Sequence, residues 1–131
     1  MQKLRYIRIA RQSGAAVVQF VETDLSGPLL AEGLESELMQ LIGDLHPALV
    51  VVDFTDVKMI TSSVIGALLT TRRKLLQQGG RLRLCSVPLP IHEVYRTLNL
   101  DRRILPVFES FERALGAPDV PAEPTIEQME D

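Results

Sequence analysis

Residues 50–69 read VVVDFTDVKMITSSVIGALL, and this stretch decides the fold. The apolar run Val50–Val52 is typical of a strand that is covered on both faces. Asp53 and Asp56 follow this run. They favour a turn, because the Asp side chain readily accepts hydrogen bonds from nearby backbone N–H groups. Ser62 and Ser63 follow, and the apolar residues after them recur at helical spacing. The stretch therefore predicts a buried strand, a loop and an amphipathic helix that begins with two adjacent serines.

The sequence on both sides of this stretch alternates between strand-like and helical patterns. Two initial strands joined by a tight turn favour an antiparallel hairpin, and the later alternation favours parallel neighbours joined by right-handed crossovers. We therefore expect an α/β domain with a mixed sheet of about five strands and about four flanking helices. The expected strands cover residues 4–10, 15–21, 48–52, 82–87 and 104–108. The expected helices begin at Pro28, Ser62, Pro88 and Ser110, and Gly43 is expected to end the first.

The composition changes after residue 116. A chain of 131 residues, 46% of them hydrophobic, is long enough for a single domain with its own core. Residues 117–131 instead hold three prolines and five acidic residues, without lysine or arginine. Such a segment buries too little apolar surface to offset the entropy of ordering. We therefore expect one domain over residues 1–116 and a disordered acidic tail over residues 117–131.

Composition and charge argue against several kinds of partner. A formal net charge of −3, the absence of tryptophan and 5% aromatic residues disfavour nucleic-acid binding. No apolar run approaches the roughly 20 residues that a membrane-spanning helix needs, and the N-terminus lacks a signal-peptide pattern. The single cysteine, Cys85, lies in a strand-like run and is expected to be a small buried residue. The expectation is a cytoplasmic protein without direct membrane insertion.

Enzyme signatures are missing from the sequence. Glycine-rich phosphate loops and paired-cysteine motifs are absent, and Arg96 stands where the string that begins at His92 needs a second zinc-binding histidine. A response-regulator receiver is a rival interpretation, with Asp53 as its phosphoacceptor. A receiver also needs an acidic pair after its first strand and a lysine after its last, where Pro106 stands instead. No catalytic residue, cofactor or metal site is therefore predicted.

Two hypotheses account for Ser62 and Ser63. Serine is a preferred helix N-cap and contributes about 1 kcal/mol to stability in that position. An exposed hydroxyl at a helix N-terminus is also a suitable phosphoacceptor, because free N–H groups and the helix dipole stabilise an added phosphoryl group. The residues alone leave both hypotheses open.

Sequence blocks that follow one another along the chain match the pattern of a known family. Residues 50–69 are similar to an apolar strand with Asp, followed by Asp-Ser-Ser-Gly-Leu-Gly. Residues 78–85 are similar to a Gly-Gly-x-Leu-x-Leu strand, and residues 94–101 to a Thr-Gly-Leu-Asp segment. Residues 105–115 are similar to a closing strand and a Glu-x-Ala-Leu helix. With these blocks the chain resembles the STAS domain family, and the resemblance implies that fold.

The resemblance also implies a function. STAS domains include bacterial anti-sigma factor antagonists, so it implies a non-enzymatic protein-interaction module whose partner is an anti-sigma factor with serine kinase activity. In partner-switching members this kinase phosphorylates the serine after the motif's Asp, a position that falls on Ser62, with Ser63 as the neighbouring candidate. The partner-binding surface implied by the resemblance comprises Asp53, Asp56, Thr61, Ser62, Val64 and Ile65.

The sequence departs from the family motif at two positions. Thr61 stands where the family has Asp, which removes a carboxylate expected to orient the serine hydroxyl. Val64 stands where the family has Gly, which adds a β-branched side chain where a partner would approach the backbone. The alternative hypothesis is an adaptor subunit of a larger complex, such as a lipid transporter, that uses the same surface unphosphorylated.

Overall fold

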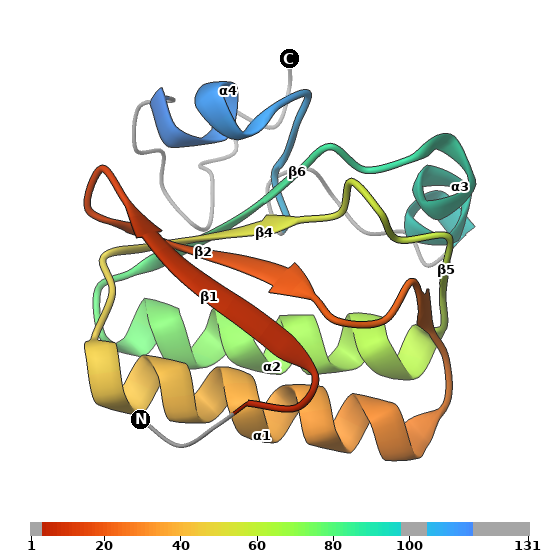
Figure 1. The fold of residues 1–131 in the computed structure, drawn as a ribbon, viewed down its shortest axis with the longest axis horizontal. Coiled ribbons are helices and arrows are strands. Elements are labelled where there is room, and N and C mark those ends of the chain that lie inside the picture. The colour runs from red at the N-terminus through yellow and green to blue at the C-terminus, as the bar shows by residue number, and fades with distance from the viewer. Residues whose placement is uncertain (1–3, 98–104, 117–131) are drawn as a thin grey trace, which may run out of the picture.

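The computed structural model describes residues 4–97 and 105–116, where strands and helices alternate after an initial hairpin (Figure 1). The predicted alternation is confirmed. The strands are β1 (Ile7–Gln12), β2 (Ala15–Phe20), β3 (Asp24–Leu25), β4 (Leu49–Asp53), β5 (Met59–Ile60), β6 (Arg81–Cys85) and β7 (Val107–Phe108). The helices are α1 (Pro28–Leu45), α2 (Ser62–Gln77), α3 (Leu89–Thr97) and α4 (Phe111–Gly116). The tail expected over residues 117–131 lies outside the described residues.

The described strands form one main sheet of five strands, in the order β1-β2-β4-β6-β7. β1 and β2 are an antiparallel hairpin, whereas β2, β4, β6 and β7 run parallel. In the central register Val18 lies opposite Val52, which lies opposite Leu84. The structure therefore confirms the predicted α/β fold, with a five-strand mixed sheet and four helices.

Helices cover both faces of this sheet. α1 and α2 lie side by side against one face, and α4 covers part of the other (Figure 1). The main core lies between the sheet and the α1–α2 pair, where Val52 and Leu68 are at most 1% exposed. Val51 points to the opposite face and packs in a smaller cluster with Cys85 and Ala114. β4 is therefore covered on both faces, as its apolar run predicts, and Cys85 is buried as expected.

The first helix ends later than predicted. α1 continues through Gly43 to Leu45. His46 ends it in the left-handed conformation (φ 46°), and the His46 N–H donates to the carbonyl oxygen of Ile42. The expectation that Gly43 ends α1 is wrong, because His46 occupies the left-handed position that glycine usually fills, directly before Pro47.

A second, two-stranded sheet has no counterpart among the predicted elements. β3 and β5 pair in parallel, with Asp24 opposite Met59 and Leu25 opposite Ile60. Each strand has only two residues, which is too short for a periodic pattern. Because β3 leads into α1 and β5 into α2, this pairing places the starts of both helices at the end of the main sheet where β2 and β4 finish (Figure 1).

Candidate functional site

The start of α2 is tied to the start of α1 through Thr61. Thr61 is the N-cap of α2, with an extended backbone (φ −107°, ψ 164°), and Ser62 is the first helical residue. The Thr61 hydroxyl oxygen accepts a hydrogen bond from the Gly27 N–H (3.2 Å) and lies 3.1 Å from the Ser63 hydroxyl oxygen. No side-chain hydrogen bond caps α2, a helix that the structure describes in full. The hypothesis that Ser62 or Ser63 is the N-cap is therefore wrong.

The two serines differ in accessibility. Ser62 is exposed, whereas Ser63 is half-buried and its hydroxyl faces Thr61. Ser62 lies in the first turn, where N–H groups without intrahelical partners and the positive end of the dipole favour a negative charge. Neither α2 nor the adjoining α1 has an acidic residue in its first turn. Ser62 is therefore the more accessible of the two serines, and a phosphoryl group on it would lie at the N-terminus of α2.

Val64 and Ile65 do not lie on the surface. Val64 is 0% exposed and Ile65 is 2% exposed, and both pack in the main core. The expectation that their side chains belong to a partner-binding surface is therefore wrong. A signal for this is present in the sequence: Val64, Ile65 and Leu68 share one helical face, and this is the face that an amphipathic helix buries.

Asp53 lies at the carboxyl end of β4 and holds the loop that follows. Its carboxylate accepts hydrogen bonds from the Gln19 side-chain amide (3.0 Å), the Thr55 N–H (2.9 Å) and the Thr55 hydroxyl (2.5 Å). Burial by itself would raise the pKa of Asp53, but the hydrogen bonds from Thr55 and Gln19 together lower this pKa below its ordinary value. An ionised Asp53 therefore orders the loop between β4 and β5.

Asp53 and Asp56 line one small hollow together with Glu22. Its volume of about 20 Å³ leaves room for roughly one water molecule. The structure thus brings the two aspartates together, at a place to which Ser62 does not contribute. Within residues 4–97 and 105–116, no three His, Cys, Asp or Glu side chains are placed to hold a metal ion.

Four segments at the end of the molecule where α2 begins each carry an exposed, large apolar side chain. Val21 follows β2 and Met59 lies in β5, whereas Leu29 and Leu89 lie in the first turns of α1 and α3 (Figure 1). Leu29 and Leu89 are each 77% exposed, and Met59 is 51% exposed. Of the described residues, the exposed large hydrophobic ones are these four, which we call the apolar patch: Val21, Leu29, Met59 and Leu89.

The sequence does not predict the apolar patch. Its members come from four separate segments, so no local pattern brings them together. One sequence feature does indicate that Leu29 is exposed: it falls outside the buried stripe of α1, which includes Leu34 and Leu38. Apolar side chains exposed together mark sites of protein–protein contact more often than scattered ones do.

The family model of the STAS domain matches residues 7–114. The chain belongs to the STAS domain family. It is similar to the solved structure of an anti-sigma-factor antagonist (STAS) domain protein from Planctomyces limnophilus, with 24% identity, coverage of 83% of this chain and 94% of that chain, and a TM-score of 0.74. It is also similar to the anti-sigma factor antagonist SpoIIAA in its unphosphorylated form (15% identity, 86% and 99% coverage, TM-score 0.70).

A sulfate transporter family protein from Wolinella succinogenes is a further structural relative (15% identity, 81% and 85% coverage, TM-score 0.63). No curated protein sequence matches the chain at a significant level. The structural likenesses show the STAS fold that the sequence resemblance implies. In the described part of this STAS domain, no helix is both long and apolar enough to cross a membrane.

The two departures from the STAS motif have structural consequences. At the position where the family motif has Asp, the Thr61 hydroxyl joins the start of α2 to the start of α1. The Val64 side chain points into the core instead of outward. Val64 therefore adds no apolar side chain to the surface beside Ser62.

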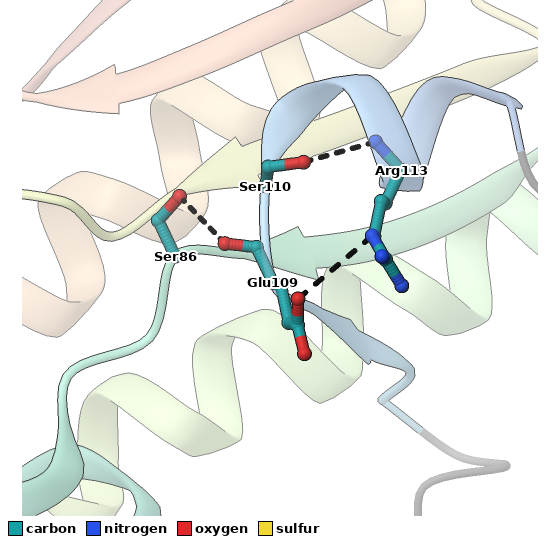
Figure 2. Close-up of polar contacts among 4 residues, drawn as sticks. All are labelled: Ser86, Glu109, Ser110 and Arg113. Carbon is teal, nitrogen blue, oxygen red and sulfur yellow. Dashed lines mark hydrogen bonds and ion pairs between the residues drawn. The ribbon is translucent and has the colours of Figure 1, made fainter.

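A second polar cluster lies where β6 and β7 end (Figure 2). The Ser110 hydroxyl oxygen accepts a hydrogen bond from the Arg113 N–H (3.2 Å) at the start of α4. The Glu109 carboxylate pairs with the Arg113 side chain (3.8 Å), and the Ser86 hydroxyl lies 3.5 Å from the Glu109 carbonyl oxygen. These contacts fix the start of α4, so this cluster has a structural role in the STAS domain.

Proposed function

We propose that this STAS domain is an anti-sigma factor antagonist in a phosphorylation-controlled partner switch. It acts as a non-enzymatic protein-interaction module in the cytoplasm, its partner is a kinase-type anti-sigma factor, and Ser62 is the phosphoacceptor. One observation carries the proposal: an exposed serine at the start of α2 lies at the same end of the molecule as the apolar patch. A partner that buries this patch brings its own surface against Ser62.

The proposed switch follows from the charge of a phosphoryl group. Phosphorylation of Ser62 adds a charge of about −1.5 to −2. The N-terminus of α2 favours that charge, so the fold persists. The same charge must be desolvated when a partner covers the apolar side chains Leu29 and Met59, which weakens the complex.

The alternative proposal is an adaptor that uses the same surface unphosphorylated. Thr61 in place of the motif's Asp favours it, because the carboxylate expected to orient the serine is missing. The structural likeness to a sulfate transporter family protein also favours it, since that relative is not named as an antagonist. In an adaptor, the charge state of Ser62 has no regulatory role.

An affinity measurement separates the two proposals. The probe is a purified kinase-type anti-sigma factor, and calorimetry measures its binding to the wild type, Ser62→Ala and Ser62→Asp. We expect Ser62→Asp to weaken binding by roughly tenfold or more, equivalent to about 1.4 kcal/mol, and Ser62→Ala to leave it unchanged.

The matched control is Ser36→Asp, which adds the same charge at an exposed serine in the middle of α1. We expect this variant to bind like the wild type, and all variants to unfold with similar midpoints. Equal affinity of Ser62→Asp and the wild type would favour the adaptor. Failure of the wild type to bind the anti-sigma factor would contradict the antagonist proposal altogether.

A further inference from the structure

The strand β1 forms an edge of the main sheet. It pairs with β2 on one side, and no other strand of the described chain pairs with it (Figure 1). β1 has six residues, whereas β7 at the opposite edge has two. The outward backbone groups of an edge strand can pair with a further strand. β1 is therefore the longer of the two edges at which this sheet can be extended.

The turn between β1 and β2 determines which backbone groups of β1 face outward. Its two central residues both have positive φ (52° and 84°), as in the two-residue turns that close tight hairpins. Such a turn makes Gln12 and Ala15 a pair that exchanges both backbone hydrogen bonds, and these pairs then recur at every second residue. The backbone N–H and carbonyl groups of Ile7, Ile9 and Arg11 therefore point away from β2.

Contacts at the start of β1 agree with this alternation. The Val21 N–H donates to the carbonyl oxygen of Tyr6 (2.9 Å), whereas the Ile7 N–H donates to the Glu37 carboxylate of α1 (3.1 Å). That carboxylate also accepts hydrogen bonds from the two N–H groups that precede Ile7 (2.7 and 2.9 Å). A carboxylate therefore already satisfies the first outward N–H of this edge. The outward N–H groups further along β1 have no such partner among the described residues.

Two arginines flank the open part of the edge, one on each face of the sheet. Ile9 packs against the main core, so Arg11 lies on that same face and Arg8 lies on the opposite face. Both arginines are exposed, and neither forms a hydrogen bond or an ion pair with another described residue. A strand added along β1 would therefore meet a cation on each of its faces. Because opposite charges on neighbouring strands attract, this edge favours a strand with a carboxylate on each face.

The same arginines disfavour a second copy of β1 as the added strand. The sequence of β1 is IRIARQ, which contains no acidic residue. Pairing of two β1 strands would place four arginines along one seam, and like charges on neighbouring strands are destabilising. Charged side chains on edge strands commonly prevent such self-pairing. The edge therefore fits an acidic sequence better than its own.

We propose that β1 is a docking site for an acidic, extended segment of another protein, which adds to the main sheet as a sixth strand. The outward backbone groups of Ile9 and Arg11 bind the backbone of the segment. Arg8 and Arg11 select carboxylates that are three residues apart in the segment. β2 separates this edge from β4, the strand that leads towards Ser62, so the proposal does not depend on the partner switch.

An NMR titration of the ¹⁵N-labelled full chain with the capped hexapeptide Val-Glu-Thr-Val-Glu-Val tests this proposal. At saturating peptide we expect slower amide exchange at Ile9 and Arg11. Exchange at Ala10 should not change, because its N–H already bonds to β2. A control peptide with lysine in place of both glutamates should bind at least about tenfold more weakly.

Matched variants locate the surface involved. Arg8→Gln/Arg11→Gln should weaken binding of the acidic peptide at least about fivefold. The control Arg73→Gln/Lys74→Gln removes the same charge from two exposed residues of α2 and should leave binding unchanged. Equal effects of the two double variants would overturn the proposal, because net charge alone would then account for binding.

Four further results would overturn the proposal. Absence of binding at millimolar peptide would show that the edge does not accept an acidic strand, and equal binding of the lysine peptide would show that the arginines do not select carboxylates. Unchanged exchange at Ile9 and Arg11 in the bound state would show that the peptide does not add to β1. A dimer in sedimentation velocity, with Ile9 protected in the absence of peptide, would show that a second copy occupies the edge.

Discussion

The face of the sheet that carries α1 and α2 differs from the face that carries α4 in what holds its helices. On the first face, two long helices pack through side chains such as Leu38 and Leu68, which are 1% exposed. On the second, a six-residue helix covers a small cluster, and the buried Arg83 supplies a hydrogen bond to Ala114 (2.7 Å) and lies over the Phe108 ring (5.7 Å). One face is held by apolar packing and the other partly by a single cation.

The candidate site belongs to neither face. Ser62 and the apolar patch lie where the parallel strands end and α1, α2 and α3 begin. In open α/β sheets, ligands bind in this region, outside the carboxyl ends of the strands. Substitutions on the two faces should therefore affect stability, whereas substitutions at this end should affect binding.

The largest effect is expected in the α1–α2 core. Leu68→Ala removes a side chain that is 1% exposed, and the lost burial and the resulting cavity should lower the free energy of unfolding by about 2–5 kcal/mol. Urea unfolding followed by circular dichroism measures this loss. A midpoint within error of the wild type would contradict the assignment of the main core to this face.

A smaller effect is expected on the α4 face. Arg83→Ala leaves the Ala114 carbonyl oxygen without its buried donor, which should lower the free energy of unfolding by about 1–3 kcal/mol. The exposed control Arg73→Ala should change it by less than about 0.5 kcal/mol. Hydrogen exchange should show that Arg83→Ala loses protection, relative to the wild type, mainly in α4. Equal loss of protection in α2 would mean that the two faces are not held independently.

The smallest effect on stability concerns Asp53. Its pKa is lower in the folded state than in the unfolded chain, so its ionised form stabilises the fold above about pH 4. This contribution should disappear as the pH falls through the lower, folded pKa. Carbon-detected NMR titration should find the pKa of Asp53 below its ordinary value, and Thr55→Val should raise it by removing a hydroxyl donor. An ordinary or raised pKa in the wild type would contradict the role of these hydrogen bonds.

The sequence predicted the elements whose patterns are long and local. The apolar run of β4 and the helical spacing of α2 each extend over enough residues for their period to be recognised. β3 and β5 have two residues each and form only because they pair with each other. The end of α1 depends on the left-handed backbone of His46, which composition does not reveal.

The sequence predicted only those features of the candidate site that depend on neighbouring residues. The position of Ser62 at the start of α2 is a local property, and the structure confirms that Ser62 is exposed there. The N-cap role of Thr61 depends on backbone angles and on the approach of Gly27 from a distant segment. The apolar patch is assembled from four segments by the topology of the sheet, so its existence could be seen only in the fold.

The most direct test of the central claim is to map the phosphorylation site. The full chain is incubated with a purified kinase-type anti-sigma factor and Mg-ATP, and tandem mass spectrometry locates the phosphate. We predict phosphate on Ser62 and none on Ser63, because Ser62 is exposed whereas the Ser63 hydroxyl is half-buried against Thr61. Phosphate on Ser63 alone, or no phosphate at either serine, would contradict the account.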